Sequence, residues 1–236
     1  MNALTVLGDV PGDALGVTLP HEHVLFDVRD YWEAPTEASR ILAAEQSLTI
    51  EHLGRVRYDP FLLRENLLHG DEDLATEELL DYVALGGATI VDPTNVSMGR
   101  DPLALARIAR RTGLNIIMGN GYYTEISLGA TFDAKSDDDL VQELVDDVLV
   151  GVGTTAIRAG LIGEIGTSSP ITPRELRSLR AAAAAAAVTG APLMVHLDGW
   201  AREGHVALDV IAAEGADPHK TILCHMNPSC EDLTYQ

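Results

Sequence analysis

Short apolar runs alternate with longer amphipathic segments along most of the chain. Six runs have the length of strands and consist mainly of apolar residues: 15–20, 88–94, 115–121, 159–166, 192–198 and 221–226. Five segments carry apolar residues at helical spacing: 73–85, 102–112, 138–150, 173–189 and 202–214. Because continuous apolar runs are typical of strands covered on both faces, the alternation predicts βαβ units and a parallel sheet.

Local signals mark the boundaries of one helix with particular clarity. Thr172 and Pro173 have the residue types of an N-cap and a first helical position, and Glu175 completes a capping box. Gly190 has the residue type that ends a helix. The alanine run 181–187 lies inside this helix and needs no explanation beyond packing, since Ala is the best helix former. Near the end of the sequence, Ser229 with Asp232 predicts the cap of a further helix.

Two regions lie outside this alternation. Ahead of the first predicted strand, the segment around Pro11-Gly12-Asp13 predicts a small β-hairpin. Residues 28–72 have weak periodicity and are expected to form an irregular insertion over one end of the sheet. The six βα units fit two architectures, an open doubly wound sheet or three quarters of an eight-stranded barrel.

Composition and charge exclude several classes of partner. The chain has 236 residues, of which 46% are hydrophobic and 22% charged, as in globular domains. A net charge of −20 argues against nucleic acid and anionic membranes, which both require a basic surface. Two cysteines, Cys224 and Cys230, do not form a disulfide scaffold. The N-terminal segment has no signal-peptide pattern and no run is long enough to span a membrane, so the cytoplasm is the expected compartment.

Ligand-type side chains recur at the carboxyl ends of four predicted strands. His21 and His23 end the first strand, Glu164 lies in the fourth, His196 ends the fifth and His225 the sixth. The two-residue spacing places His21 and His23 on one face of an extended chain. In parallel α/β architectures these strand ends converge on one mouth, where active sites are found.

A single histidine at a strand end is more often a hydrogen-bonded rim or core residue than a ligand. Five imidazole and carboxylate groups at matching positions favour a metal site instead, because zinc, manganese and iron take these ligands in hydrolytic sites. Glu22 points away from its neighbours on the strand and receives no catalytic role. The remaining histidines fall in loops or helices and are interpreted as surface residues: His52, His69, His205 and His219.

The chain resembles the phosphotriesterase-related branch of the amidohydrolase superfamily in six motifs. They occur in the family's order, span essentially all 236 residues, and read TLPHEH, DPTNVSMGRD, GNGYY, IRAGLIGEIGTS, VHLDG and CHMNPSCEDL. The H-x-H strand together with GEIGTS is the specific part of this resemblance, because GNGYY alone is a weak signal.

The resemblance implies an α/β fold of the amidohydrolase type, a (β/α)8 TIM barrel, with two divalent metal ions at the mouth. Zinc is the first expectation, with manganese, cobalt or iron as alternatives. By position, His21 and His23 are the implied ligands of the more buried metal ion. His196 and His225 are the implied ligands of the more exposed one.

The implied bridge between the two metal ions is Glu164. Many relatives use a carboxylated lysine on the fourth strand, but the two lysines of this chain, Lys135 and Lys220, lie elsewhere. A recognised subgroup of the family has a glutamate at this place. Its carboxylate supplies the same two oxygens, so the substitution is chemically coherent.

The activity that the resemblance implies is that of a binuclear metal-dependent hydrolase acting on a small-molecule substrate. A metal-bridging water attacks a lactone, ester, amide or phosphoester bond. Tyr122 or Tyr123 is a candidate for hydrogen bonding to the substrate, and aromatic packing on the barrel rim is the equally weighted alternative. Weaker candidates for the pocket rim are Asn95, Arg100 and Asp198.

In the family, two further strands follow the sixth, and an aspartate that ends the eighth strand binds the more buried metal and handles the proton of the water. Residues 1–236 contain neither strand. We therefore expect a single hydrolase domain whose barrel is truncated after the sixth strand, with poor activity until extended. Completion by another subunit stays open as an alternative, and so does a homodimer.

Two rival hypotheses remain. The chain is a catalytically impaired or non-catalytic metal-binding remnant of the family, or an unrelated parallel α/β protein whose strand-end histidines are rim residues. Metal analysis separates the three hypotheses: about two ions per chain are expected for the hydrolase, about one for the remnant and none for the unrelated protein.

Overall fold

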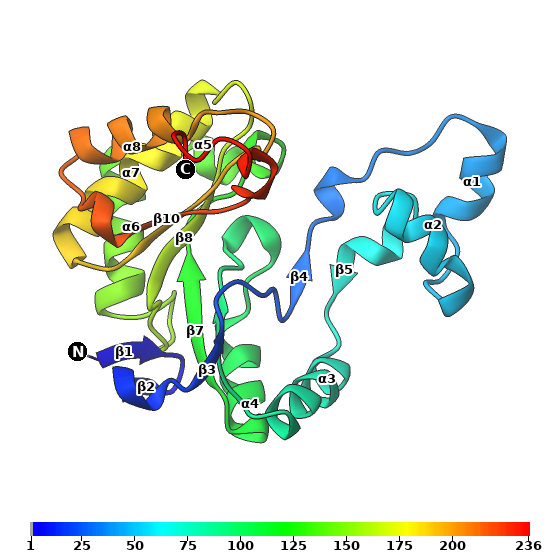
Figure 1. The fold of residues 1–236 in the computed structure, drawn as a ribbon, viewed down its shortest axis with the longest axis horizontal. Coiled ribbons are helices and arrows are strands. Elements are labelled where there is room, and N and C mark those ends of the chain that lie inside the picture. Colours follow the sequence, from blue (N-terminus) through cyan, green and yellow to red (C-terminus); the bar gives the residue numbers. More distant parts are fainter. Residues whose placement is uncertain (1) are drawn as a thin grey trace.

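Six parallel strands form one curved sheet in the computed structural model, which describes residues 2–236 (Figure 1). The strands are β3 (Val17–Leu19), β6 (Gly87–Asp92), β7 (Asn115–Asn120), β8 (Leu161–Gly166), β9 (Leu193–His196) and β10 (Thr221–Leu223). Their order in the sheet is β10-β9-β8-β7-β6-β3, so neighbours in space are also successive in the chain. A doubly wound sheet reverses its order at a switch point, so the stepwise order identifies the barrel alternative.

All five predicted helices are confirmed within two residues at each end. They are α3 (Glu72–Ala84), α4 (Pro102–Thr112), α6 (Asp137–Leu149), α7 (Pro173–Thr189) and α8 (Gly204–Ala213). Neighbouring helices α6, α7 and α8 pack side by side along the sheet (Figure 1). A short helix, α5 (Ala130–Asp133), was not predicted.

Helix α7 has the ends that its sequence predicts. Thr172 Oγ1 accepts a hydrogen bond from the Glu175 backbone N–H at 3.2 Å, and the Thr172 N–H donates to the Glu175 side chain at 2.9 Å. Gly190 ends the helix in the left-handed conformation, with φ of 71°. The alanines of this helix are mostly buried, which confirms their packing role: Ala181, Ala182, Ala183, Ala185 and Ala186.

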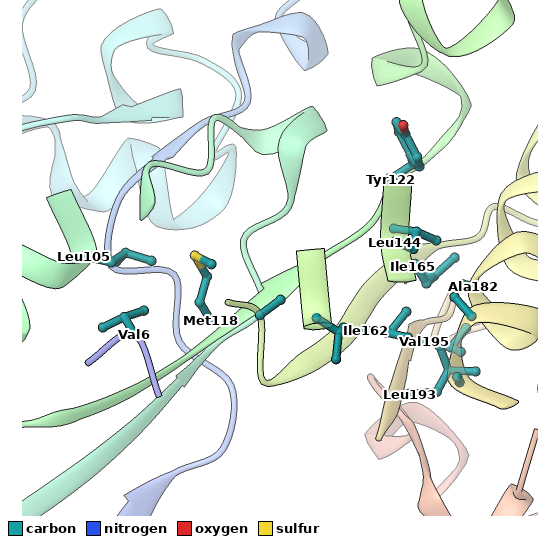
Figure 2. Close-up of a cluster of buried hydrophobic side chains, with 14 of the residues drawn as sticks. Val6, Leu105, Met118, Tyr122, Leu144, Ile162, Ile165, Ala182, Leu193 and Val195 are labelled. Carbon is teal, nitrogen blue, oxygen red and sulfur yellow. The ribbon is translucent and has the colours of Figure 1, made fainter. Parts of the chain in front are cut away.

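The core lies between the sheet and these helices (Figure 2). Strand side chains such as Met118, Ile162 and Val195 are fully or almost fully buried, and Ala182 of α7 packs in the same cluster. Because this core fixes the strands, it also fixes the positions of the side chains that follow their carboxyl ends.

The N-terminal hairpin is present, but its turn lies elsewhere than predicted. Strand β1 (Asn2–Thr5) pairs antiparallel with β2 (Gly8–Pro11), so the chain reverses at residues 6–7. The Thr5 hydroxyl stabilises this turn by donating to the Gly8 carbonyl at 2.8 Å. The predicted turn around Pro11-Gly12-Asp13 is therefore wrong, because Gly12–Ala14 form a 3-10 helix after the hairpin.

The insertion 28–72 is only partly as expected. Strands β4 (Phe26–Asp27) and β5 (Leu68–His69) pair as a stem, beyond which lie α1 (Ala38–Ala44) and α2 (Leu53–Tyr58). Figure 1 shows α1 and α2 projecting away from the sheet, so the predicted location over one end of the sheet is wrong for this outer part. The antiparallel stem directs both chain segments outwards.

The helix predicted from Ser229 and Asp232 does not form. The chain makes a 3-10 helix at Asn227–Ser229 and then only turns. Ser229 Oγ donates backwards to the Met226 carbonyl at 2.7 Å instead of capping a new helix. Within residues 2–236, none of the helices combines the length and apolar character that crossing a membrane requires.

Candidate metal centre

Four histidines and one glutamate converge where the strands end. His21 and His23 follow β3, Glu164 lies in β8, His196 ends β9 and His225 follows β10. The parallel order of the sheet brings these ends together, as the sequence predicts. Within residues 2–236, the ligand atoms form two potential metal-binding groups, His21–His23–Glu164 and Glu164–His196–His225, each with atoms within 4.8 Å of one another.

The Glu164 carboxylate stands between two pairs of imidazoles. Its Oε1 lies 3.5 Å from His21 Nε2 and 3.3 Å from His23 Nε2. Its Oε2 lies 3.3 Å from His196 Nδ1 and 3.8 Å from His225 Nε2. Each carboxylate oxygen therefore faces one pair.

These separations fit ligands that share a cation better than direct hydrogen bonds. Charge-assisted N–H···O bonds are about 2.7–2.9 Å long. Two ligand atoms each about 2.1 Å from a tetrahedral zinc ion lie about 3.4 Å apart. The Glu164 Oε2 atom is buried and has no hydrogen-bond partner among residues 2–236. The residues thus fit two divalent cations with nitrogen and oxygen ligands.

The two groups differ in exposure. The side chains of His21, His23 and His196 are 25%, 28% and 22% exposed, whereas that of His225 is 44% exposed. Glu164 is 1% exposed. The group that contains His225 therefore faces the solvent more openly.

The environment holds Glu164 in its ionised form. Burial by itself raises the pKa of this carboxyl, but the surrounding imidazoles, His196 foremost, outweigh it and hold the pKa well below its usual range. A buried carboxylate of this kind is ready to bind cations without first losing a proton.

Backbone interactions position Glu164 across the curve of the sheet. Its N–H donates to the Pro93 carbonyl at 3.0 Å, and Asn95 Nδ2 donates to its carbonyl at 2.7 Å. Asn95 is fully buried, so its predicted place on the pocket rim is wrong. The segment that follows β6 therefore anchors the glutamate of β8.

Three of the imidazoles have a further polar neighbour. His23 Nδ1 lies 2.9 Å from Thr94 Oγ1, His21 Nδ1 lies 3.5 Å from Cys224 Sγ, and Tyr123 OH lies 3.1 Å from His196 Nδ1. Burial raises the pKa of the Cys224 thiol to about 12, so it stays protonated. Thr94 and the neighbouring Asp92 were not among the site residues predicted from the sequence. Their signal was their place in DPTN, directly at the end of a buried strand.

His225 has a left-handed backbone conformation, with φ of 61°, the single case among the non-glycine residues of 2–236. Such a conformation costs about 1–3 kcal/mol for a residue with a Cβ atom and clusters at functional sites. In this chain the residue with that conformation is the one whose imidazole faces Glu164, with His225 Nε2 3.8 Å from Glu164 Oε2.

The two tyrosines after β7 lie in different surroundings. Tyr123 packs edge-on against His196, with ring centroids 4.8 Å apart, and burial raises its pKa. Tyr122 belongs to the hydrophobic core (Figure 2). Its hydroxyl donates to Glu143 at 3.0 Å and accepts from Lys135 at 2.8 Å. Only Tyr123 has its hydroxyl beside the histidine cluster.

The other candidates from the sequence lie outside the two groups. Arg100 is buried in an ion pair with Asp147 at 2.9 Å, so its predicted rim position is wrong. Asp198 is exposed just after β9, near the mouth. Glu22 is exposed and belongs to neither group. The other four histidines also lie outside both groups: His205 and His219 are exposed, and His52 and His69 are half-buried. His69 lies in strand β5, so its predicted position in a loop or helix is wrong.

The strand order and the strand-end ligands together define an α/β barrel protein with a histidine–carboxylate centre. More specifically, the chain belongs to the phosphotriesterase family, whose family model matches residues 1–235. The six strands are those of a (β/α)8 barrel up to its sixth unit.

Individual relatives agree with this assignment. An N-acetyltaurine hydrolase of Danio rerio is 35% identical over 231 residues, which are 97% of this chain and 65% of that protein. The crystal structure of a resiniferatoxin-binding protein from Rhodobacter sphaeroides has 48% identity and a TM-score of 0.97, covering 100% of this chain and 66% of that one. A lactonase from Listeria monocytogenes has 25% identity and a TM-score of 0.76, covering 97% and 66%. The chain thus spans about two thirds of the length of these proteins.

Proposed function

We propose that this chain is a metal-dependent hydrolase whose histidine–glutamate cluster holds two divalent cations, zinc in the first place. The observation that carries the proposal is the convergence of four imidazoles on the buried carboxylate of Glu164. His21 and His23 would hold one cation with Oε1. His196 and His225 would hold the other with Oε2. Glu164 would be shared between them.

Two such cations, when bound, supply Lewis-acid chemistry that activates water at neutral pH and polarises the bond under attack. The residues of the chain itself do the rest. The imidazoles present neutral nitrogen lone pairs, and Glu164 contributes the negative charge. The Tyr123 hydroxyl, kept protonated by its raised pKa, would donate a hydrogen bond to an oxygen of the substrate.

The substrate class that we favour is a small carbonyl compound, an amide or a lactone, rather than a phosphotriester. Support comes from the relatives named N-acetyltaurine hydrolase and lactonase. An N-acetyl amide and a lactone are both carboxylic acid derivatives, in which the group under attack is a carbonyl. The same names favour a hydrolase over a non-catalytic remnant. We propose that residues 1–236 act as one hydrolase domain.

Metal analysis of the purified protein tests the cluster. We expect about two zinc-type ions per chain, and loss of about one ion in each of the variants His21→Ala and His225→Ala, which lie in different groups. His219→Ala is the matched control, because this exposed histidine lies in the 3-10 helix that precedes β10. Unchanged metal content in both cluster variants would refute the assigned ligands.

Activity is tested with a panel of an N-acyl amide, a lactone, an aryl ester and a phosphotriester on the zinc-loaded chain. We expect the highest kcat/KM for the amide or the lactone. A metal-loaded protein that hydrolyses none of the four would contradict the proposed function, and a clear preference for the phosphotriester would contradict the substrate class.

The two tyrosines are expected to respond differently to loss of the hydroxyl. Tyr123→Phe should lower kcat/KM about 10-fold, roughly the value of one hydrogen bond. Tyr122→Phe should leave kcat/KM unchanged and lower the free energy of unfolding by about 1 kcal/mol, because its hydroxyl bonds only to Glu143 and Lys135. Steady-state kinetics and urea unfolding of both variants check this. The reverse pattern would assign the hydrogen bond to the substrate to Tyr122 instead of Tyr123.

A further inference from the structure

Tyr31 lies at the inner end of the insertion 28–72, beside its stem. It ends the 3-10 helix Arg29–Tyr31, which begins one residue after strand β4. The Val28 N–H donates to the Leu67 carbonyl at 2.8 Å, so the short helix starts where the two chain segments of the stem are still joined. The stem therefore fixes the place of Tyr31.

The base of the stem packs against the segment that follows β6. Arg29 donates to the two oxygens of Asp27 at 2.8 and 2.6 Å. Asp27 in turn lies against Gly99, where an added Cβ would come within 3.1 Å of the Asp27 Cβ. Ser97 of the same segment accepts a hydrogen bond from the Tyr123 N–H at 3.3 Å. The stem and the loop that carries Tyr123 thus have a common support.

The Tyr31 side chain contacts that loop in two ways. Its hydroxyl and the Thr124 hydroxyl are hydrogen-bonded to each other, and its ring centroid lies 5.9 Å from that of Tyr123, within the usual range of aromatic pairs. The Tyr123 ring also packs against His196, and its hydroxyl lies 3.1 Å from His196 Nδ1. One tyrosine ring therefore connects the insertion to the histidine cluster.

The backbone of Tyr123 has supports of its own, so the contact with Tyr31 bears on the side chain. Besides the hydrogen bond of its N–H, β8 approaches so closely that a Cβ at Gly166 would come within 2.8 Å of the Tyr123 Cα. The Tyr123 ring has two aromatic neighbours, Tyr31 and His196. Because the His196 imidazole faces Glu164, Tyr31 is the neighbour that can hold the tyrosine ring.

We propose that Tyr31 is a positioning residue for Tyr123, which holds the Tyr123 ring so that its hydroxyl stays beside the histidine cluster. The insertion thereby contributes to the active site through its inner end. The consequence for catalysis rests on the proposed function, in which the Tyr123 hydroxyl donates to the substrate. Without the Tyr31 ring, that hydroxyl is no longer held in place, and a displaced donor is worth little more than an absent one.

A double-mutant cycle in kcat/KM tests whether Tyr31 acts through Tyr123. Tyr31→Ala should lower kcat/KM about 10-fold in the wild-type background but less than about twofold in a chain that already carries Tyr123→Phe. Tyr58→Ala is the matched control and should change nothing, because Tyr58 lies on α2 of the same insertion and is 94% exposed. Unchanged kcat/KM in Tyr31→Ala, or losses that multiply to about 100-fold in the double variant, would overturn the inference.

The order of the Tyr123 ring can be measured without metal and without activity. Carbon-13 spectra of protein labelled at tyrosine Cζ report six tyrosines, and the Tyr123 signal is the one lost in Tyr123→Phe. We expect one narrow Tyr123 signal in the wild type and in Tyr58→Ala. In Tyr31→Ala it should be broadened or split, because the ring samples more than one position. A signal that is displaced but still single and narrow would show a ring that is fixed without Tyr31, and would overturn the inference.

Should Tyr31→Ala fold poorly, Thr124→Val provides a second route. It keeps the shape of the side chain and both tyrosines but removes the hydroxyl that anchors Tyr31. We expect a loss of about threefold in kcat/KM that is again absent beside Tyr123→Phe, and metal content should stay unchanged, since neither Tyr31 nor Thr124 is a proposed ligand. Unchanged kcat/KM in the folded variant would contradict the positioning role. A wild-type chain that hydrolyses nothing, while its Tyr123 signal responds to Tyr31→Ala, would overturn the proposed function instead.

Discussion

Glu164→Gln is expected to remove metal from both groups of the centre at once. Glutamine has the shape of glutamate, but it offers one neutral oxygen and an amide nitrogen that cannot bind a cation. The group facing the nitrogen loses its oxygen ligand, and the group facing the oxygen loses its negative charge. Metal content should fall from about two ions per chain to well below one, since divalent ions depend on such anionic ligands.

The rate of hydrolysis should fall together with the metal content of the variant. Outer-shell substitutions cost about 10–100-fold, so loss of the shared ligand should cost more than about 100-fold in kcat/KM. The variant should remain folded without metal, because the exchange is isosteric and removes a buried charge. Metal analysis, kinetics and circular dichroism of the same preparation check the three parts.

Glu143→Gln is the matched control for this experiment. Glu143 is a partly buried glutamate that pairs with Lys135 and accepts from Tyr122, and it contacts none of the four histidines of the centre. It should retain both ions. A Glu164→Gln protein that keeps two ions would rule out Glu164 as their shared ligand. Loss of a single ion would mean that only one of the two cations depends on Glu164.

The sheet and the centre could be predicted because their signals are local or follow from strand direction. Each strand is an apolar run in the sequence. Helix α7 has residues of the types that begin and end helices at its two ends, Thr172 and Gly190. Once parallel strands are inferred, their carboxyl ends must meet, so the convergence of His196 and Glu164 needs no knowledge of distances. The family motifs then supplied the pairing of ligands.

The predictions from the sequence that proved wrong concern contacts between residues that are far apart in the chain. Arg100 looks like a rim residue in sequence, but its partner Asp147 comes from the end of α6, and only the fold brings the two together. The insertion projects because two strands of two residues each pair as its stem, which is too short to show a period. Thr94 was missed because its place in DPTN marks the end of a strand but does not show that its side chain lies beside His23, which is 71 residues away in the chain.

Gly163→Ala is expected to be strongly destabilising. Gly163 has φ of +133°, a region that residues with a Cβ rarely adopt, and a Cβ there would lie 2.8 Å from Met194 Cβ and closer still to the Met194 carbonyl oxygen. Strain and overpacking each cost about 1–3 kcal/mol, so the free energy of unfolding should drop by at least about 3 kcal/mol. Urea unfolding measures it.

This glycine also determines where Glu164 points. The register of β8 shifts at this place, since Asn120 of β7 pairs with both Ile162 and Gly163, and irregularities of this kind redirect the following side chain. A Cβ at 163 would push β8 from β9 and with it the carboxylate from the imidazoles, so any folded Gly163→Ala protein should also bind less than about one ion per chain. Gly54→Ala is the control, because Gly54 lies exposed in α2 with open space around it, and there alanine should stabilise by about 0.5–1 kcal/mol. Equal stability of Gly163→Ala and wild type would mean that β8 does not need the glycine to present Glu164.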